Sequence, residues 1–261
     1  MTELRHRLAT LQMRATARLL DDLVATAIKK RLGPIQLLEY VVDLEESERN
    51  KRSLERRTKM ARLPKFKLMA DFEWQWPSKV DRALIESVVA LDFVEHAMNV
   101  VLVAPPGLGK TMIAQNIVHE AVLAGLSARF ITASDLLLDL AAQDSPRTLE
   151  RRLRYYAAFT VLAIDEVGFL PHGGRHADLL YQLINRCYAK RSLVVTTNLA
   201  FAEWGSIFPN ATCVTAIVER LIHRAEIVSL DGDSYRAAEA ERETKRRQVA
   251  RAAKAASTRK R

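Results

Sequence analysis

The first 60 residues place apolar side chains at helical spacing. Leucine or alanine recurs every three or four positions from Leu4 to Leu23, which predicts an amphipathic helix over the opening segment. Gly33-Pro34 interrupts the pattern, and proline suits the first turn of a second helix. The apolar face expected to be buried by that second helix consists of Leu37, Leu38, Val41 and Leu44. We therefore expect a small all-α domain over residues 1–66.

From residue 80 the pattern changes to short aliphatic runs that alternate with helical stretches. The runs are "NVVLVA", "ARFITA", "FTVLAID" and "RSLVVTTN". Continuous β-branched runs without polar alternation are typical of parallel strands buried on both faces. Their alternation with helices predicts an α/β domain over residues 80–236, in which helices flank a parallel sheet.

Two further segments complete the chain. Residues 67–79 are expected to be a linker, and the aromatic residues near it are Phe66, Phe72, Trp74 and Trp76. These rings would either seat the linker on the domain core or stack on a nucleotide base. Residues 237–261 have almost no large apolar side chain, so we expect a basic tail that is disordered, or helical only when bound.

Charge is distributed unevenly along the chain. The formal net charge is +9, yet residues 49–67 and residues 242–261 each carry nine Lys or Arg and one Glu, a net +8 apiece. The remainder is therefore acidic. Two basic segments on an acidic body predict a polyanionic partner such as DNA, although a solvated surface would show the same composition.

The first basic segment has a periodic stripe. Arg49, Arg52, Arg56 and Lys59 lie three or four residues apart, which places them on one helical face. We interpret this face as a DNA-binding surface. The alternative is local pairing with acidic residues at i,i+4, namely Glu45–Arg49, Glu48–Arg52 and Glu55–Lys59.

Residues 104–111, "APPGLGKT", have the spacing of a phosphate-binding Walker A loop. The expected ATP-binding residues are Ala104, Pro105, Pro106, Gly107, Leu108, Gly109, Lys110 and Thr111. Backbone N–H groups would surround the phosphates, and a side chain at Gly109 would obstruct that approach. Lys110 would neutralise phosphate charge, and the Thr111 hydroxyl would bind Mg²⁺. Ala104 replaces the usual first glycine, which an ordinary strand-end conformation tolerates.

"TVLAIDEVGF" supplies the partner motif, in which an aliphatic strand ends in two acids. Asp165 would hold the Mg²⁺ together with Thr111, and Glu166 would deprotonate the attacking water. This pair of acids favours hydrolysis over transfer of phosphate to a small molecule. Asn198 ends the run "SLVVTTN" and would place an amide near the γ-phosphate and the water, although asparagine after a strand is often only a turn residue.

Together these motifs resemble the AAA+ family, and within it the IstB/DnaC-like group, over about residues 5–236. "APPGLGKT", "AIDEVGF" and "VVTTN" carry the resemblance for the ATPase domain. "LERRTKMARLPKFKLMADFEW" is similar to the leader of IstB-like transposition helpers, and "AIVERLIHRAEIVSLDGDSYR" to the carboxyl end of the group.

The resemblance implies roles for three further residues. Arg220 matches the arginine finger, which completes the site of a neighbouring subunit, and Arg224 is the runner-up for that role. Arg236 matches the second sensor, and Asn198 matches the first. A surface ion pair is the alternative for each arginine.

The resemblance implies an ATP-dependent regulator of transposition that forms a ring or helical homo-oligomer on duplex DNA and engages a transposase. It would use ATP and Mg²⁺ and hydrolyse ATP at subunit interfaces. The alternatives are a replicative helicase loader and a DNA-architectural protein that binds ATP with little hydrolysis.

The sequence also bears on localisation. The opening "MTELRHRLATL" lacks the apolar run of a signal peptide, and no stretch is apolar enough to span a membrane. The widely spaced Cys187 and Cys213 indicate reduced thiols, so we expect a cytoplasmic protein.

Overall fold

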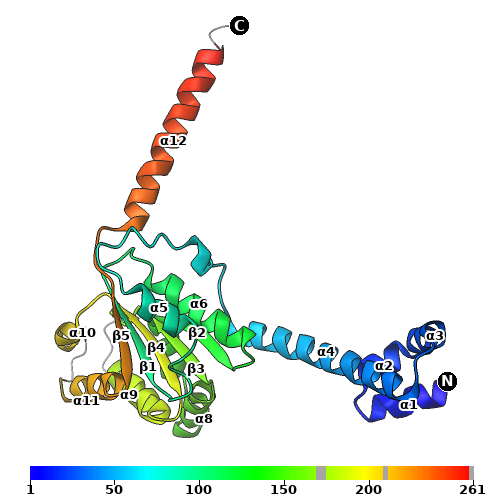
Figure 1. Ribbon diagram of the computed structural model, residues 1–261. Coiled ribbons are helices and arrows are strands. Elements are labelled where there is room, and N and C mark those ends of the chain that lie inside the picture. The colour runs from blue at the N-terminus through cyan, green and yellow to red at the C-terminus, as the bar shows by residue number, and fades with distance from the viewer. Residues whose placement is uncertain (169–174, 208–210, 259–261) are drawn as a thin grey trace. The chain divides into compact units, whose positions relative to one another are not determined.

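The computed structural model describes residues 1–168, 175–207 and 211–258 (Figure 1). The chain divides into two compact units, Met1–Lys59 and Met60–Arg261. The helix α4 (Pro34–Ala61) continues through the boundary between them. Each unit is considered by itself below.

The first unit is helical, as its sequence predicts, but its opening segment is not one helix. It contains α1 (Thr2–Thr10), α2 (Arg14–Arg18), α3 (Leu20–Lys30) and the greater part of α4. Gln12 separates α1 from α2 with a φ of 63°, although neither glycine nor proline marks the break. The apolar face expected on α4 is half-buried at best, and Leu38 is 62% exposed.

The second unit contains a five-stranded parallel sheet in the order β2-β3-β4-β1-β5. The four predicted strands are confirmed as β1 (Asn99–Val103), β2 (Ala128–Thr132), β3 (Val161–Asp165) and β4 (Ser192–Thr197). The edge strand β5 (Ala225–Ser229) was not predicted, because its polar and partly exposed residues lack the aliphatic run of the other four.

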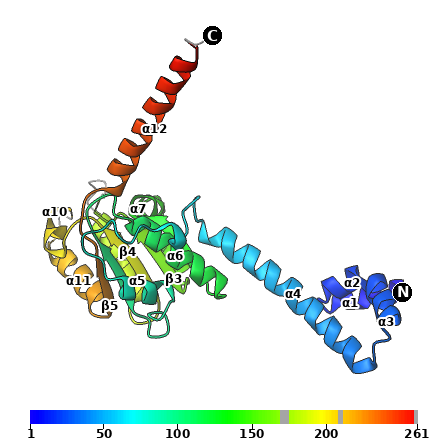
Figure 2. The same ribbon diagram turned by 45° about the horizontal axis from the view of Figure 1, so that its top comes forward.

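Helices cover both faces of the sheet, as Figures 1 and 2 show. On one face lie α5 (Arg82–Val89) and α6 (Lys110–Leu123). On the other lie α7 (Ala133–Ala141), α8 (Pro146–Ala157), α9 (His176–Cys187) and α11 (Ala211–Ile222). Val101, Leu162 and Val195 point into the second layer, whereas their neighbours in the strands point into the first, which explains why the strand sequences are apolar throughout. The short α10 (Trp204–Ile207) precedes α11.

The last described element is α12 (Tyr235–Thr258), a helix in the segment for which we expected a tail that is disordered, or helical only when bound. Alanine, arginine, glutamate and lysine dominate this segment, and all four are strong helix formers. Within the described ranges, no helix combines the length and the apolar character needed to cross a membrane. Cys187 is buried and Cys213 is half-buried.

Candidate nucleotide-binding site

The predicted Walker A loop joins the carboxyl end of β1 to the first turn of α6. Gly107 and Gly109 have φ values of 88° and 91°, a region that side chains disfavour. The ammonium of Lys110 donates to the carbonyl oxygens of Ala104 at 2.5 Å and Pro105 at 2.8 Å, so it lies folded against its own loop. Burial lowers the pKa of Lys110, although the nearby carboxylate of Asp165 acts in the opposite direction. Ala104 has no positive φ, which explains why alanine is accommodated there.

The predicted acid of β3 lies beside this loop. The Thr111 hydroxyl donates to both carboxylate oxygens of Asp165, at 3.1 and 3.2 Å, and the Thr196 hydroxyl donates to one of them at 2.5 Å. Asp165 is 4% exposed, and this burial raises its pKa, although the two hydroxyls and Lys110 act in the opposite direction. Thr196, on the adjacent strand β4, was not identified from the sequence.

Glu166 follows Asp165 with a φ of 61°, which is strained for a residue with a side chain. Its backbone N–H donates to the Thr196 hydroxyl at 2.9 Å, which fixes the turn. The turn leaves the Glu166 side chain exposed at the pocket, one residue beyond the buried carboxylate. Successive carboxylates thus face different surroundings, as a metal-binding acid and a water-activating acid would require.

The structure brings Asn198 and Arg236 to the same pocket. Asn198 follows β4, and its side-chain oxygen is buried without a hydrogen bond to any described residue. Arg236 follows Tyr235, whose backbone N–H donates to the Gly107 carbonyl at 3.1 Å. Ser234 precedes Tyr235, and a Cβ added at Gly107 would meet its hydroxyl at 2.2 Å. The "SYR" segment therefore packs directly on the Walker A loop.

The pocket measures about 270 Å³ and extends from this polar end to a second end that the sequence did not reveal. The second end is lined by residues of the linker and of α12, namely Lys67, Asp71, Phe72, Glu73, Trp76, Pro77, Tyr235 and Glu239. Phe72 is buried against the flank of Gly109, where a Cβ would approach its ring to 2.7 Å. Some linker aromatics therefore seat the linker on the domain, and Trp76 also lines the pocket.

Arg220 lies at the opposite edge of the sheet. Asn99, the first residue of β1, donates to the backbone carbonyls of Arg220 at 3.5 Å and Leu221 at 3.0 Å. The two ends of this five-residue strand, Asn99 and Val103, lie roughly 13 Å apart at 3.3 Å per residue. The Walker A loop starts after Val103, at the end away from Arg220. The guanidinium of Arg220 lies 4.7 Å from the centre of the Tyr181 ring, and Arg224 is exposed.

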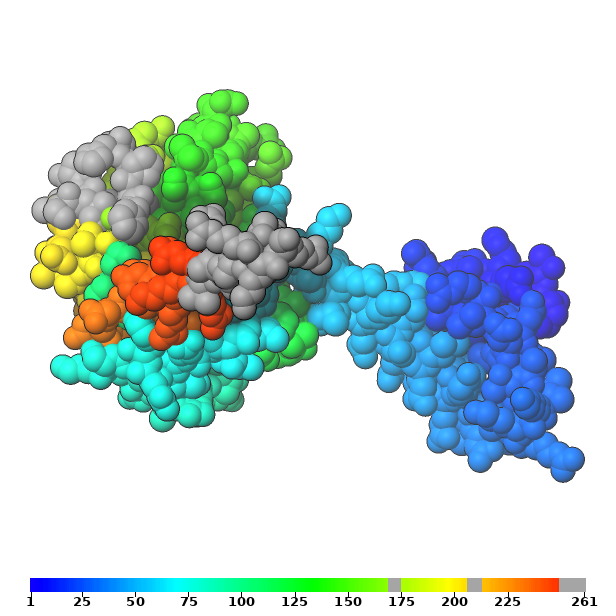
Figure 3. All heavy atoms as spheres, turned by 90° about the horizontal axis from the view of Figure 1, so that it is seen from above, coloured from blue at the N-terminus to red at the C-terminus, as the bar shows by residue number. Residues whose placement is uncertain are grey.

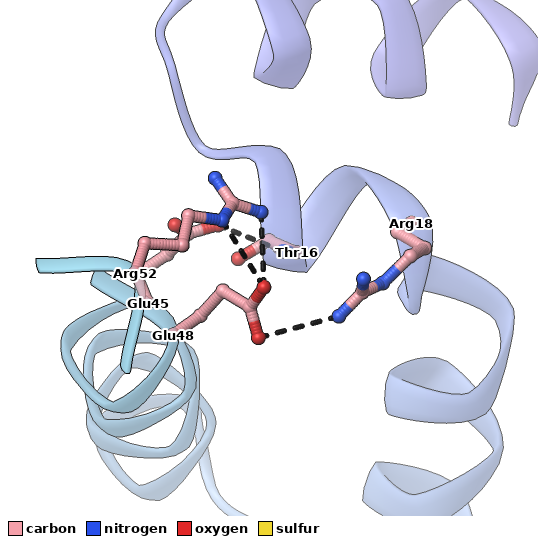
Figure 4. A network of polar contacts seen from close by, with 5 residues as sticks. All are labelled: Thr16, Arg18, Glu45, Glu48 and Arg52. Atoms are coloured by element: carbon pink, nitrogen blue, oxygen red, sulfur yellow. Dashed lines mark hydrogen bonds and ion pairs between the residues drawn. The ribbon is translucent and has the colours of Figure 1, made fainter. Parts of the chain in front are cut away.

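The predicted DNA-binding residues Arg49, Arg52, Arg56 and Lys59 are all exposed on α4. One of the three expected local pairs forms, because Arg52 contacts Glu48 at 3.0 Å (Figure 4). Glu48 also contacts Arg18 of α2, and these cations lower the pKa of Glu48. Glu45 is buried and instead accepts a hydrogen bond from the Thr16 backbone at 2.8 Å. Among the described residues, Arg49, Arg56 and Lys59 have no ion-pair partner.

The pocket residues fit ATP and Mg²⁺ on chemical grounds. Two positive-φ glycines, a lysine and the first amides of α6 form a cradle suited to phosphate. Thr111 and Asp165 offer the oxygen ligands that Mg²⁺ prefers. Mg²⁺ is usually bound through one or two protein oxygen ligands together with substrate phosphates, a role that these two residues suit. Within the described residues, no group of three or more His, Cys, Asp or Glu could hold a metal ion.

Comparisons with known proteins agree with this geometry. The chain matches the model of the IstB-like ATP binding protein family over residues 6–243. It is 35% identical over 236 residues to the ATP-binding protein assigned to insertion sequence IS21 in Pseudomonas aeruginosa, covering 90% of this chain and 89% of the relative. The corresponding IS232 protein of Bacillus thuringiensis subsp. berliner is 33% identical over 226 residues, with 87% and 90% covered.

A likeness to a solved structure supports the fold. The crystal structure of DnaI aligns with a TM-score of 0.51 at 17% identity, covering 67% of this chain and 92% of that one. The expected fold, a parallel sheet with flanking helices, is thereby confirmed. Because the family model spans nearly the whole chain, this protein belongs to the family of IstB-like ATP-binding proteins.

Proposed function

We propose that this protein is an ATPase that regulates DNA transposition. It binds ATP and Mg²⁺, assembles into a homo-oligomer on duplex DNA, engages a transposase and hydrolyses ATP between subunits. The observation that carries the proposal is the contact between Thr111 and Asp165 beside Lys110, with Glu166 at the mouth of the same pocket. The relatives' association with insertion sequences supports transposition as the process.

Hydrolysis would use residues that the fold already holds in place. Lys110 would exchange its carbonyl contacts for phosphate oxygens, which are stronger partners for an ammonium. The exposed carboxylate of Glu166 would accept a proton from the attacking water, and the unpaired amide oxygen of Asn198 would help to orient that water. Bound Mg²⁺ would supply positive charge that stabilises the transferring phosphoryl group.

The position of Arg220 supports an assembly of several copies. The length of β1 separates its backbone from the Walker A loop, so it cannot serve the pocket of its own chain. A second copy that presented Arg220 to this pocket would complete the site. ATP occupancy, oligomerisation and hydrolysis would then depend on one another.

The α4 surface supports a DNA contact in the first unit. Arg49, Arg56 and Lys59 carry charge that no described acidic side chain neutralises, and Glu45, an expected partner of Arg49, is occupied by Thr16. Uncompensated charges on one helical face are suited to successive phosphates.

ATP turnover of the purified full-length protein, with and without duplex DNA, tests the proposal. We expect hydrolysis that duplex DNA stimulates and that Lys110→Ala abolishes together with ATP binding. If the protein binds ATP but does not hydrolyse it in the presence of duplex DNA, the proposed ATPase activity is contradicted. If only single-stranded DNA stimulates hydrolysis, the result favours the alternative of a replicative helicase loader.

A further inference from the structure

Two segments far apart in the sequence share one wall of the pocket. The linker contributes Lys67, Glu73 and Trp76, and the first turns of α12 contribute Tyr235 and Glu239. In the space-filling view of Figure 3, the surface of α12 lies against the surface of the linker. The nucleotide pocket is therefore bounded partly by the carboxyl-terminal helix.

Direct contacts join these segments at the pocket. The Tyr235 hydroxyl donates to Glu73 at 2.7 Å, and the Lys67 ammonium contacts Glu239 at 2.9 Å. The Trp76 ring lies edge-on to Tyr235, with 5.5 Å between ring centres. The indole N–H of Trp76 also donates to the backbone carbonyl of Asp233, just before the helix, at 2.8 Å.

Arg242 extends this contact beyond the pocket. It lies seven residues after Tyr235, two helical turns along the same face of α12. Its guanidinium lies 3.6 Å from the Glu73 carboxylate and 5.2 Å from the centre of the Trp76 ring. Arg242 therefore contacts two pocket residues of the linker without lining the pocket itself.

These contacts suit a reversible attachment. The ion pairs are exposed, with Arg242 and Glu73 at 52% and 47% side-chain exposure, and such pairs are individually weak. The docked position of α12 is thus one side of an equilibrium that a ligand in the pocket would shift. The ligand would favour docking because docking completes the wall that it contacts.

We propose that α12 is a nucleotide-responsive element, so that ATP in the pocket favours docking of α12 on the linker and docking strengthens ATP binding by the same factor. The inference rests on the proposed function, since it takes ATP as the occupant. Most of the basic residues of α12 follow Arg242, and the family match ends at residue 243. ATP would therefore control how the basic part of this helix is presented to DNA.

Hydrogen–deuterium exchange of the full-length protein tests this coupling, with AMPPCP as a nucleotide that is not hydrolysed. Calorimetry on the same samples measures the affinity for AMPPCP. We expect AMPPCP to slow amide exchange over residues 235–247 in the unaltered protein. Arg242→Gln should reduce that protection and weaken AMPPCP binding by about two- to fivefold, the range for an exposed charged pair. Arg247→Gln is the matched control, because Arg247 pairs with Glu243 of the same helix, and it should change neither quantity.

Two results would overturn the inference while leaving ATP binding intact. One is binding of AMPPCP with no change in exchange over residues 235–247. The other is an Arg242→Gln variant that binds AMPPCP and is protected like the Arg247→Gln control. Failure of the unaltered protein to bind AMPPCP would instead refute the proposed function, and the inference with it.

Discussion

Asp165 carries a negative charge in surroundings that disfavour it. Its carboxylate is buried and receives hydrogen bonds from the neutral hydroxyls of Thr111 and Thr196, without an ion pair among the described residues. Burial raises its pKa in the folded protein. A stability cost at a position suited to bind a cation is typical of functional sites, where activity and stability compete.

Asp165→Asn should therefore stabilise the ligand-free protein at neutral pH while removing Mg²⁺-dependent nucleotide binding. Because the folded pKa lies above the unfolded value of about 3.9, folding takes up a proton in the window between them, and stability falls as pH rises through it. The asparagine of the variant does not ionise, so the variant does not lose this stability as pH rises. Its Tm should exceed that of the unaltered protein at pH 7, and the difference should narrow as pH is lowered toward about 4. A variant less stable at pH 7 would show that the carboxylate stabilises the fold.

Glu166→Gln should retain ATP binding and hydrolyse ATP about a hundredfold more slowly, since the amide cannot accept the proton of the attacking water. The turn at residue 166 depends on the hydrogen bond from the backbone N–H of that residue to Thr196, which the substitution preserves. Single-turnover hydrolysis measures the effect. Glu95→Gln, an exposed carboxylate outside the pocket, is the control and should behave like the unaltered protein. Near-normal hydrolysis in Glu166→Gln would assign the proton transfer to another residue.

At the scale of elements, the sequence predicts the helices and strands whose pattern of apolar residues reflects burial in the fold. The strands β1 to β4 are buried on both faces, so their aliphatic runs are unambiguous, whereas the edge strand β5 is not and escaped prediction. Helical spacing also predicts that the opening segment is helical, but not that it breaks at Gln12, where no glycine or proline stands.

The candidate site likewise has one part that the sequence predicts and one part that it does not. Spacing alone pointed to Lys110, Thr111 and Asp165, because a strand, a loop and a helix fix their relative positions locally, and the structure brings all three together. The wall formed by Trp76 and Tyr235 depends on contact between segments more than 150 residues apart, and no periodicity reveals such a contact.

The exposed face of α4 yields a prediction about salt. Replacing Arg49, Arg56 and Lys59 by Gln should weaken binding to duplex DNA and flatten the dependence of log K on log salt by up to roughly 3 units per protomer, if all three contact phosphate. Arg52 is left in place, because it contacts Glu48, the residue of α4 that also contacts Arg18 of α2. Binding isotherms at three salt concentrations give the slope.

The matched control removes the same charge from the same unit at Arg7, Lys29 and Lys30, which are exposed outside α4. This variant should keep the original slope. Equal slopes in the two triple variants would show that the α4 face is an ordinary solvated surface, and the proposed DNA contact would have to be placed elsewhere, for example on α12.

At the scale of the whole molecule, the proposed site would be incomplete within one chain. The residues proposed to bind phosphate lie at the carboxyl edge of the sheet, whereas Arg220 is held at the amino edge by Asn99. Its guanidinium stacks on Tyr181, which would keep it ordered for a neighbouring copy. The proposed hydrolysis therefore requires at least two copies, one that holds ATP and one that contributes the arginine.

Mixing two inactive variants tests this requirement most directly. Lys110→Ala should lose ATP binding, and Arg220→Ala should bind ATP but not hydrolyse it, because each lacks a different half of the shared site. When the two are mixed on duplex DNA, interfaces that pair the intact pocket of the Arg220→Ala copy with the intact arginine of the Lys110→Ala copy should restore part of the ATP turnover. If the variants co-assemble, as a tagged copy would reveal, and the mixture still shows no turnover, Arg220 does not act between subunits and the account of a shared site is wrong.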